Sequence, residues 1–294
     1  MAQGKPSNPL LSLIGEVLPL GWPELAAVGD EPPRGRAKRR GAAEAFFLAI
    51  VFGALPVHAA TMEEGAGTYK TQAIQEIAQS LTDAKEMSAR LDSGDFDAAR
   101  KEWKEAREGW ERSEVFTGEF FADLDAAIDA WPDAKEGFHA IEAQLFAKGD
   151  AAAIKPMAKT LVENLAMFKA ELGDAALTPQ GLLNGATKLA YEIGENKAAG
   201  GESPWSGNSL SDMRYNVQGI EAVYRMVFES ALKANDGKLA ADIDARIEAL
   251  ESLLKASDLK SLDQDKVRET GEDLAVAFQA AGPRLGLAKP SLED

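Results

Sequence analysis

The chain has 294 residues, of which 45% are hydrophobic and 27% are charged, a composition typical of a folded protein and not of a disordered or collagen-like one. Acidic residues outnumber basic ones by 48 to 32, so the formal net charge is −16; such a surface repels phosphate backbones, and we expect no nucleic acid as partner. The absence of cysteine excludes disulfides, thiolate nucleophiles and sulfur-ligated metals.

Residues 1–59 have the pattern of a signal peptide with an upstream extension. A basic stretch at residues 34–40 precedes an apolar run at residues 45–55, which is too short to span a bilayer as a helix. Small residues then follow at 57–59, as a signal peptidase requires. We predict cleavage after Ala59 and export to the periplasm, with association with the cell surface as a further option.

The rest of the chain has the periodicity of amphipathic helices. Apolar residues recur at three- and four-residue steps from Tyr69 to Leu91, and again in a second helix through Trp103 and Trp110. Shorter helices are expected near 118–130 and 135–147, and a longer one follows from Ile154. No window shows the alternation of β-branched residues that is typical of strands, so the predicted fold is all-α.

The second half continues the same pattern. Thr178-Pro179 predicts the start of a helix, residues 198–209 read as a loop rich in glycine and serine, and three more helices follow. We predict two packed four-helix bundles, at residues 60–173 and 174–294. Residues from 282 onward are expected to form a frayed tail.

Carboxylates stand where this periodicity predicts inward positions. Glu114 continues the inward face of the second helix, with Glu111 one turn before it. His139 and Glu142 lie three residues apart on one face of a later helix, and Asp129 ends the helix between these two. Because a buried carboxylate needs a compensating partner, either an arginine such as Arg107 or a metal ion is expected here.

This set of side chains admits two interpretations. One imidazole with three or four carboxylates suits iron, zinc, copper(II) or manganese and, less well, calcium. Alternatively, His139 fills a core position and the glutamates are ordinary solvated residues, because Glu-x-x-Glu occurs by chance in an acidic protein. The spacing alone does not decide between these interpretations.

A family resemblance favours the metal. The run at residues 137–142, GFHAIE, resembles the GxHxxE motif of the imelysin family, in the form found in EfeO/EfeM-like proteins of bacterial iron uptake. Residues 106–114 resemble the family's YERxE segment with Trp110 in place of tyrosine, and residues 124–129 resemble its LDxxID segment. Residues 181–183 and 201–206 resemble its later GLL and E-x-YS elements.

The resemblance implies a periplasmic double four-helix bundle that binds a metal ion. The metal ligands it implies are Glu111, Glu114, Asp129, His139 and Glu142. Two departures stand out. The cupredoxin domain of full-length EfeO proteins is missing, which indicates the short, EfeM-like form, and a family segment with a TDL-like sequence reads GNSLSD at residues 207–212.

Three classes of function follow from these observations. The first is a non-enzymatic protein that captures a divalent or trivalent metal ion, iron before zinc, copper or calcium, and passes it to an inner-membrane iron permease. The family carries a peptidase label, but zinc peptidases place two histidines on one helix as HExxH, so proteolysis is not expected.

The alternative is a binding protein for an acidic polysaccharide such as alginate, with Trp205 as a stacking surface and Lys188, Lys197 or Arg214 as anion partners. The third is a structural module without ligand.

Overall fold

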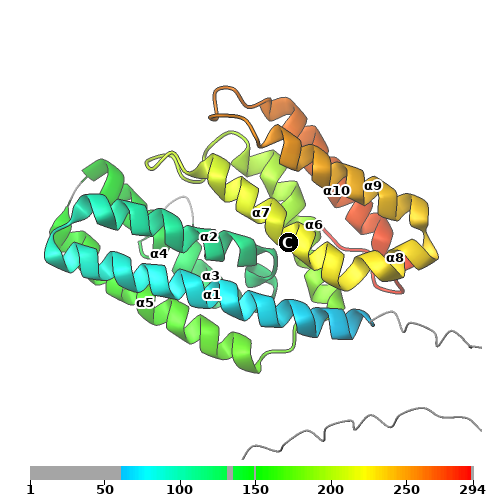
Figure 1. The fold of residues 1–294 in the computed structure, drawn as a ribbon, viewed down its shortest axis with the longest axis horizontal. Coiled ribbons are helices and arrows are strands. Elements are labelled where there is room, and N and C mark those ends of the chain that lie inside the picture. Colours follow the sequence, from blue (N-terminus) through cyan, green and yellow to red (C-terminus); the bar gives the residue numbers. More distant parts are fainter. Residues whose placement is uncertain (1–60, 131–134, 149, 293–294) are drawn as a thin grey trace, which may run out of the picture. The chain divides into compact units, whose positions relative to one another are not determined.

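The predicted all-α fold is confirmed. The computed structural model describes residues 61–130, 135–148 and 150–292, and in this part of the chain the regular elements are helices, with no strand (Figure 1). None of the helices described there is long and apolar enough to cross a membrane. The predicted signal peptide and its cleavage site lie outside the described residues.

Helices α1 (Met62–Ser93) and α2 (Phe96–Phe120) form a long hairpin. Thr61 and Glu64 form a capping box at the start of α1, and Gly94 ends this helix in the left-handed conformation. The side chain of Asp95 then accepts a hydrogen bond from the backbone N–H of Ala98 and starts α2. Local sequence signals therefore fix both ends of the turn.

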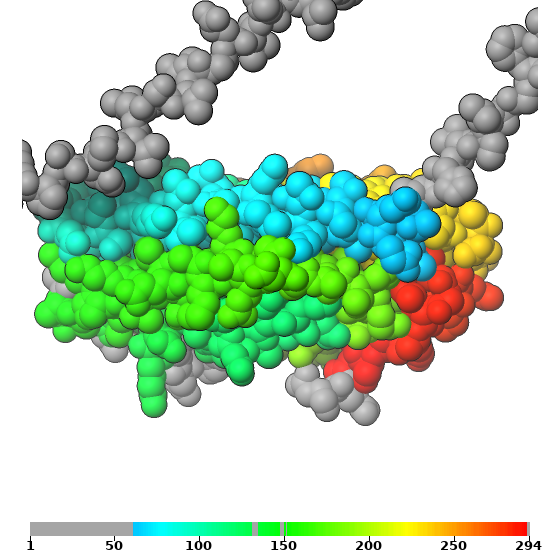
Figure 2. Space-filling model, turned by 90° about the horizontal axis from the view of Figure 1, so that it is seen from below, coloured from blue at the N-terminus to red at the C-terminus, as the bar shows by residue number. Residues whose placement is uncertain are grey.

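Three helices and a π-helical segment complete the first half of the described chain. They are α3 (Ala122–Asp129), α4 (Gly137–Glu142), η1 (Ala143–Lys148), which is π-helical, and α5 (Ala151–Asp174). Helix α5 packs along α1, and the two cross one face side by side (Figure 2). Trp110 of α2 contacts Phe138 of α4 and Phe168 of α5, with ring centroids 6.3 and 5.4 Å away. The two tryptophans of α2, seven residues apart, are fully buried, as their periodicity predicts.

The second half contains the remaining helices. They are α6 (Pro179–Glu192), η2 (Ile193–Lys197), α7 (Ser209–Val223), η3 (Tyr224–Phe228), α8 (Glu229–Asn235), α9 (Gly237–Leu253) and α10 (Gln264–Arg284), with η2 and η3 π-helical. Helix α10 packs against α6 and α9. Thr178 caps α6 and Pro179 occupies its first turn, as the sequence predicts.

The prediction of a frayed tail from residue 282 is wrong. Helix α10 continues to Arg284, and both Leu285 and Pro290 are buried. The side chain of Gln180 accepts a hydrogen bond of 2.7 Å from the backbone N–H of Ala288, and these last residues pack against the neighbouring helices (Figure 2, red). Composition near a terminus does not reveal such tertiary contacts, which order the backbone.

Helix α2 is the element shared by both halves. It packs against α1 and also against α6 and α7 from the second half. Since the described residues belong to one compact unit, a division into two bundles near Gly173 stays a prediction. The contact between α2 and α7 is close at Gly219, where an added methyl group would overlap the carbonyl oxygen of Arg112.

We expect Gly219→Ala to destabilise the protein by about 1 to 3 kcal/mol, because the new methyl group must push two helix backbones apart. Gly67→Ala is the matched control, since Gly67 is exposed in the interior of α1 with nothing near its added methyl group. Alanine has the higher helix propensity, so Gly67→Ala should leave stability unchanged or raise it by up to about 1 kcal/mol. Urea unfolding followed by circular dichroism measures both changes, and equal effects would contradict the close approach.

Candidate metal centre

The glycine of the GFHAIE run fixes where α4 begins. Gly137 has a φ of 78°, and a methyl group here would overlap the backbone carbonyl oxygen of Ile128, so only glycine fits. The indole N–H of Trp103 donates to the backbone carbonyl of Phe138 at 3.1 Å and fixes the same short helix to α2. As a result, α4 buries both His139 and Glu142.

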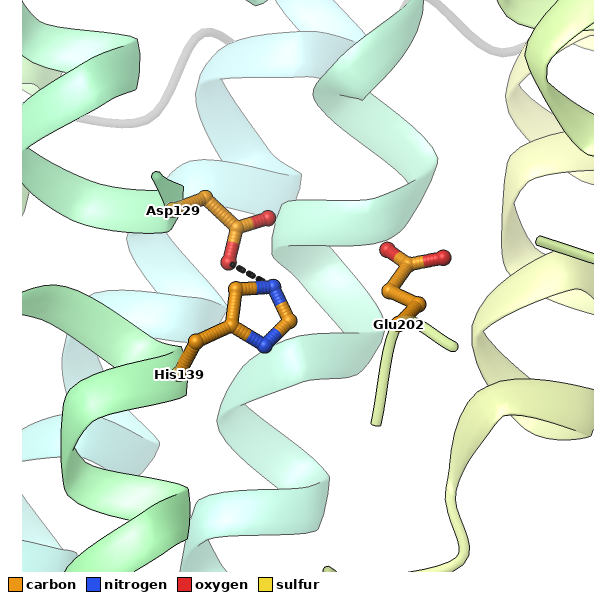
Figure 3. Close-up of side chains that lie close together, drawn as sticks. All are labelled: Asp129, His139 and Glu202. Carbon is orange, nitrogen blue, oxygen red and sulfur yellow. Dashed lines mark ion pairs between the residues drawn. The ribbon is translucent and has the colours of Figure 1, made fainter. Parts of the chain in front are cut away.

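His139 and Asp129 form the centre of the candidate site. The Nε2 atom of His139 lies 3.2 Å from Oδ1 of Asp129 (Figure 3). Asp129 also accepts a hydrogen bond of 2.6 Å from Arg107 Nη1 and another of 2.6 Å from the indole N–H of Trp110. Glu202, from the segment between η2 and α7, completes a group in which one ligand atom of each residue lies within 4.8 Å of the others.

Arg107 is buried at the middle of a larger charged cluster. Its guanidinium group pairs with Glu111, with Glu202 at 3.1 Å and with Asp212 at 3.4 Å, in addition to Asp129. Its carbon Cζ also lies 5.5 Å from the ring of Trp103 and 5.4 Å from the ring of Phe138. The side chain is therefore held by four carboxylates and by the aromatic core at the same time.

Lys197, the last residue of η2, supplies a second buried cation. Its Nζ atom lies 2.6 Å from Glu114, 3.0 Å from Glu202 and 3.9 Å from Glu111. Asn216 of α7 donates to both Glu111 and Glu114 at 2.7 Å. The two glutamates of α2 thus face the second half of the protein, Glu111 fully buried and Glu114 partly exposed.

Glu142 is bound mainly to the segment between η2 and α7. Its Oε1 atom accepts hydrogen bonds from the backbone N–H groups of Trp205 and Ser206, at 3.0 and 2.7 Å, and from the Ser206 hydroxyl at 2.7 Å. The other oxygen, Oε2, lies 3.8 Å from His139 Nδ1. Glu142 therefore orients the segment with one oxygen and faces the histidine with the other.

The structure brings the five predicted ligands into one cluster but in different roles. A pocket of about 350 Å³ is lined by Glu114, Asp129, His139 and Glu202, among others. Glu111 lies deeper, where Arg107 binds one of its oxygens and Asn216 the other. That these five residues ligate a metal ion stays a prediction. Of the five, Asp129 and His139 belong, with Glu202, to the group whose ligand atoms lie within 4.8 Å of one another.

Burial and charge shift the pKa values of the carboxylates in opposite directions. Burial raises the pKa of Glu111 well above its ordinary value, although Arg107 opposes this, and burial also raises the pKa of Glu202 to about 7. Burial would do the same to Asp129, but Arg107 and His139 outweigh it and hold this pKa well below its ordinary value. The site therefore holds carboxylates that differ in how readily they take up a proton.

The two cationic side chains at the pocket keep their charge. Burial alone would lower the pKa of His139, but the negative charge of Asp129 outweighs it and raises the pKa to about 9. Burial likewise disfavours the charged form of Lys197, yet Glu114 and Glu202 hold its pKa well above the ordinary value. At neutral pH both side chains are protonated in this arrangement.

Among the residues that the structure describes, two of the buried donor atoms suited to a metal ion have no hydrogen-bond partner. These are Nδ1 of His139 and Oε2 of Glu202, and Oδ1 of Asn216 close by is also without one. A buried polar atom left unpaired costs about 1 to 3 kcal/mol, so such atoms point to a ligand that completes them. An imidazole nitrogen with carboxylate oxygens is a donor set that fits iron and the other ions expected from the sequence.

Four residues of the cluster are not among the metal ligands expected from the sequence. They are Lys197, Glu202, Asp212 and Asn216. One signal was present: Ser209, Asp212 and Asn216 recur at three- and four-residue steps, beside the apolar face of α7, and all three are buried. Such a polar stripe next to an apolar one predicts a buried polar network.

The comparison with protein families decides which family the protein represents. The family model described as Imelysin matches residues 66–282, which include every residue of the cluster described above. The chain belongs to the imelysin family. The resemblance that the sequence motifs indicate is thereby confirmed.

Known imelysin relatives at moderate identity are named for iron uptake. The iron uptake system component EfeO of Yersinia pseudotuberculosis is 29% identical over 195 residues, which cover 63% of this chain and 52% of EfeO. The component EfeM of Bacillus subtilis is 30% identical over 135 residues, or 45% of this chain and 35% of EfeM. An EfeM/EfeO family lipoprotein of Staphylococcus haemolyticus is 28% identical over 205 residues, which cover 66% of this chain and 71% of the lipoprotein. The chain thus matches about half the length of the EfeO relatives.

A solved structure supports the same fold. The crystal structure of an iron-regulated protein A precursor from Parabacteroides distasonis superposes with a TM-score of 0.61 and covers 78% of this chain and 97% of its own. The two sequences are 17% identical, so this likeness concerns the fold alone.

We expect the His139 imidazole to titrate near pH 9 in the metal-free imelysin protein. Because this pKa is raised above the ordinary 6.5, the ion pair with Asp129 stabilises the fold fully below about pH 6.5 and loses this contribution as the pH rises through about 9. NMR titration of the imidazole protons, assigned with His139→Ala, measures it. Asp129→Asn should lower the pKa, and Asp123→Asn, at an exposed position of the same helix, should not. An unshifted value in the unmodified protein would contradict the ion pair.

Proposed function

We propose that this imelysin protein binds an iron ion, as cargo, at Asp129, His139 and Glu202, and that it is the metal-capturing component of an iron-uptake system. One observation carries the proposal: an imidazole and two carboxylates from three separate elements converge within 4.8 Å at the wall of one pocket. In the described part of the chain, His139 Nδ1 and Glu202 Oε2 are buried without a hydrogen-bond partner. A metal ion would complete the Glu202 oxygen, and its binding to His139 Nε2 would replace the ion pair with Asp129 and release the imidazole proton.

The surrounding residues fit a supporting role for this site. Glu114 lines the same pocket and is placed to add an oxygen ligand, whereas Glu142 faces His139 Nδ1 and orients the imidazole. The indole of Trp110 and the guanidinium of Arg107 hold Asp129 from behind, as outer hydrogen bonds commonly orient ligating carboxylates. When bound, the ion supplies positive charge to a cluster with more carboxylates than cations.

The proposed place of this function is the periplasm. The relatives named as iron uptake components support a role in iron uptake, and the pattern of residues 1–59 supports export. An inner-membrane iron permease is the transport partner that this role would need. Zinc, copper and calcium remain further candidates as cargo, because carboxylate and imidazole donors do not select one ion by chemistry alone.

A non-enzymatic role is part of the proposal. Hydrolysis by a bound metal ion requires a general base and an open coordination position. His139 is the one histidine among residues 61–292, and as a metal ligand it would not be available as that base. The names of the relatives agree with a binding protein rather than a peptidase.

An acidic polysaccharide has less support as the ligand. The pocket is lined by Glu114, Asp125, Asp129 and Glu202, which would repel a polyanion unless a cation bridged the two. Lys197 is paired with carboxylates, and Arg214 donates to the backbone carbonyls of Leu254 and Ala256. Trp205, which is 58% exposed, is the feature that keeps this alternative open.

Calorimetric titration of the purified protein with Fe²⁺ under argon, and with Zn²⁺, Mn²⁺ and Ca²⁺, tests the proposal. We expect one ion per chain and a loss of affinity of at least about tenfold in His139→Ala and in Asp129→Asn, because each removes a ligand. Asp123→Asn is the matched control and should bind like the unmodified protein. Absence of saturable binding, or equal binding by all four proteins, would sink the proposal.

A further inference from the structure

Lys197 occupies a position where the proposed metal ion would compete with it. Its ammonium group lies 2.6 Å from Glu114 Oε2 and 3.0 Å from Glu202 Oε1, and the side chain is 8% exposed. Both glutamates line the pocket together with Lys197 itself. A cation bound at this pocket would therefore draw on carboxylates that already hold a cation.

The two buried cations of the cluster differ in their freedom to move. Arg107 has no exposure, pairs with four carboxylates and lies close to two aromatic rings. Lys197 lines the pocket of about 350 Å³, and its ammonium is a point charge on a flexible stem. Lys197 can thus leave its partners by rotating into the pocket, whereas Arg107 cannot.

The carboxylates that Lys197 binds each keep another donor in its absence. Arg107 Nη2 donates to Glu202 Oε1 at 3.1 Å, and Asn216 Nδ2 donates to Glu114 Oε2 at 2.7 Å. These contacts hold both glutamates in place independently of the ammonium group. The site would remain organised while one cation replaces the other.

We propose that Lys197 is an internal counter-ion that balances Glu114 and Glu202 in the metal-free protein and is displaced from them when the metal ion binds. This inference rests on the proposed function and adds a specificity-determining residue to it. The lysine charge weakens binding of every cation, and it keeps the empty site from collecting adventitious ions. Because the displaced ammonium group stays in the same pocket, its repulsion of the bound ion is proportional to the charge of the ion and bears more heavily on trivalent than on divalent ions.

Substitution tests the competition. In Lys197→Met, which keeps the length of the side chain without its charge, we expect Mn²⁺ to bind roughly tenfold and Tb³⁺ roughly thirtyfold more tightly, as the Coulomb energy scales with ionic charge. Lys197→Arg keeps the charge in a group that binds carboxylates bidentately and should weaken both ions. Lys238→Met, at an exposed position of α9, changes the net charge equally and is the control.

Chemical labelling tests the displacement in the unmodified protein, so it does not depend on how a variant folds. Lys197 should react several-fold faster with an acetylating reagent in the presence of saturating Mn²⁺ than in its absence, measured by mass spectrometry of the peptides. The exposed Lys238 should react at the same rate in both states. An amine that stays paired with Glu114 and Glu202 would show no gain.

The outcomes separate this inference from the proposed function. If the unmodified protein binds neither Mn²⁺ nor Tb³⁺, the metal site itself is wrong. If it binds them, but folded Lys197→Met binds both equally or more weakly and Lys197 labelling does not rise, the site stands and the counter-ion role is overturned. A gain in affinity that is the same for both ions and is shared by Lys238→Met would also overturn it.

Discussion

The buried charge of Arg107 is the constraint on which the structure depends. An uncompensated buried ion costs several kcal/mol, and the four carboxylates that compensate this one come from four parts of the chain: α2, α3, the segment before α7, and α7. Folding must therefore bring the two halves together around α2 before this charge is balanced. The same contacts assemble the candidate metal centre, so a change that breaks them disrupts both the fold and the site.

The cluster is left with an excess of negative charge and with unpaired atoms. Six carboxylates surround Arg107, Lys197 and His139, and they are Glu111, Glu114, Asp129, Glu142, Glu202 and Asp212. A purely structural network would gain stability by pairing every buried polar atom. Here His139 Nδ1 and Glu202 Oε2 have no hydrogen-bond partner among the described residues, which is the kind of local conflict that proteins keep at functional sites.

Helical periodicity predicted the features that neighbouring residues of one helix determine. It missed those that depend on contacts between residues far apart in the sequence. The all-α fold, the buried Trp103 and Trp110 and the inward direction of Glu111 all follow from three- and four-residue spacing within one helix. Glu202 and Lys197 could not be found in this way, because they meet α2 from more than 80 residues away in the sequence. Glu202 stands in a glycine-rich segment without helical periodicity, so its burial depends on tertiary contacts alone.

The segment between η2 and α7 shows how the site also shapes its surroundings. Glu142 Oε1 accepts three hydrogen bonds from Trp205 and Ser206. Burial would raise the pKa of Glu142, but His139 and Ser206 outweigh it and hold this pKa below its ordinary value. Ser203 donates to Asp212 at 2.6 Å, and Glu202 pairs with both buried cations. The backbone N–H of Trp205 binds Glu142, and its indole is 58% exposed. The conformation of this segment thus depends on the carboxylates of the site, and any cation that shares Glu142 or Glu202 acts on the segment as well as on the site.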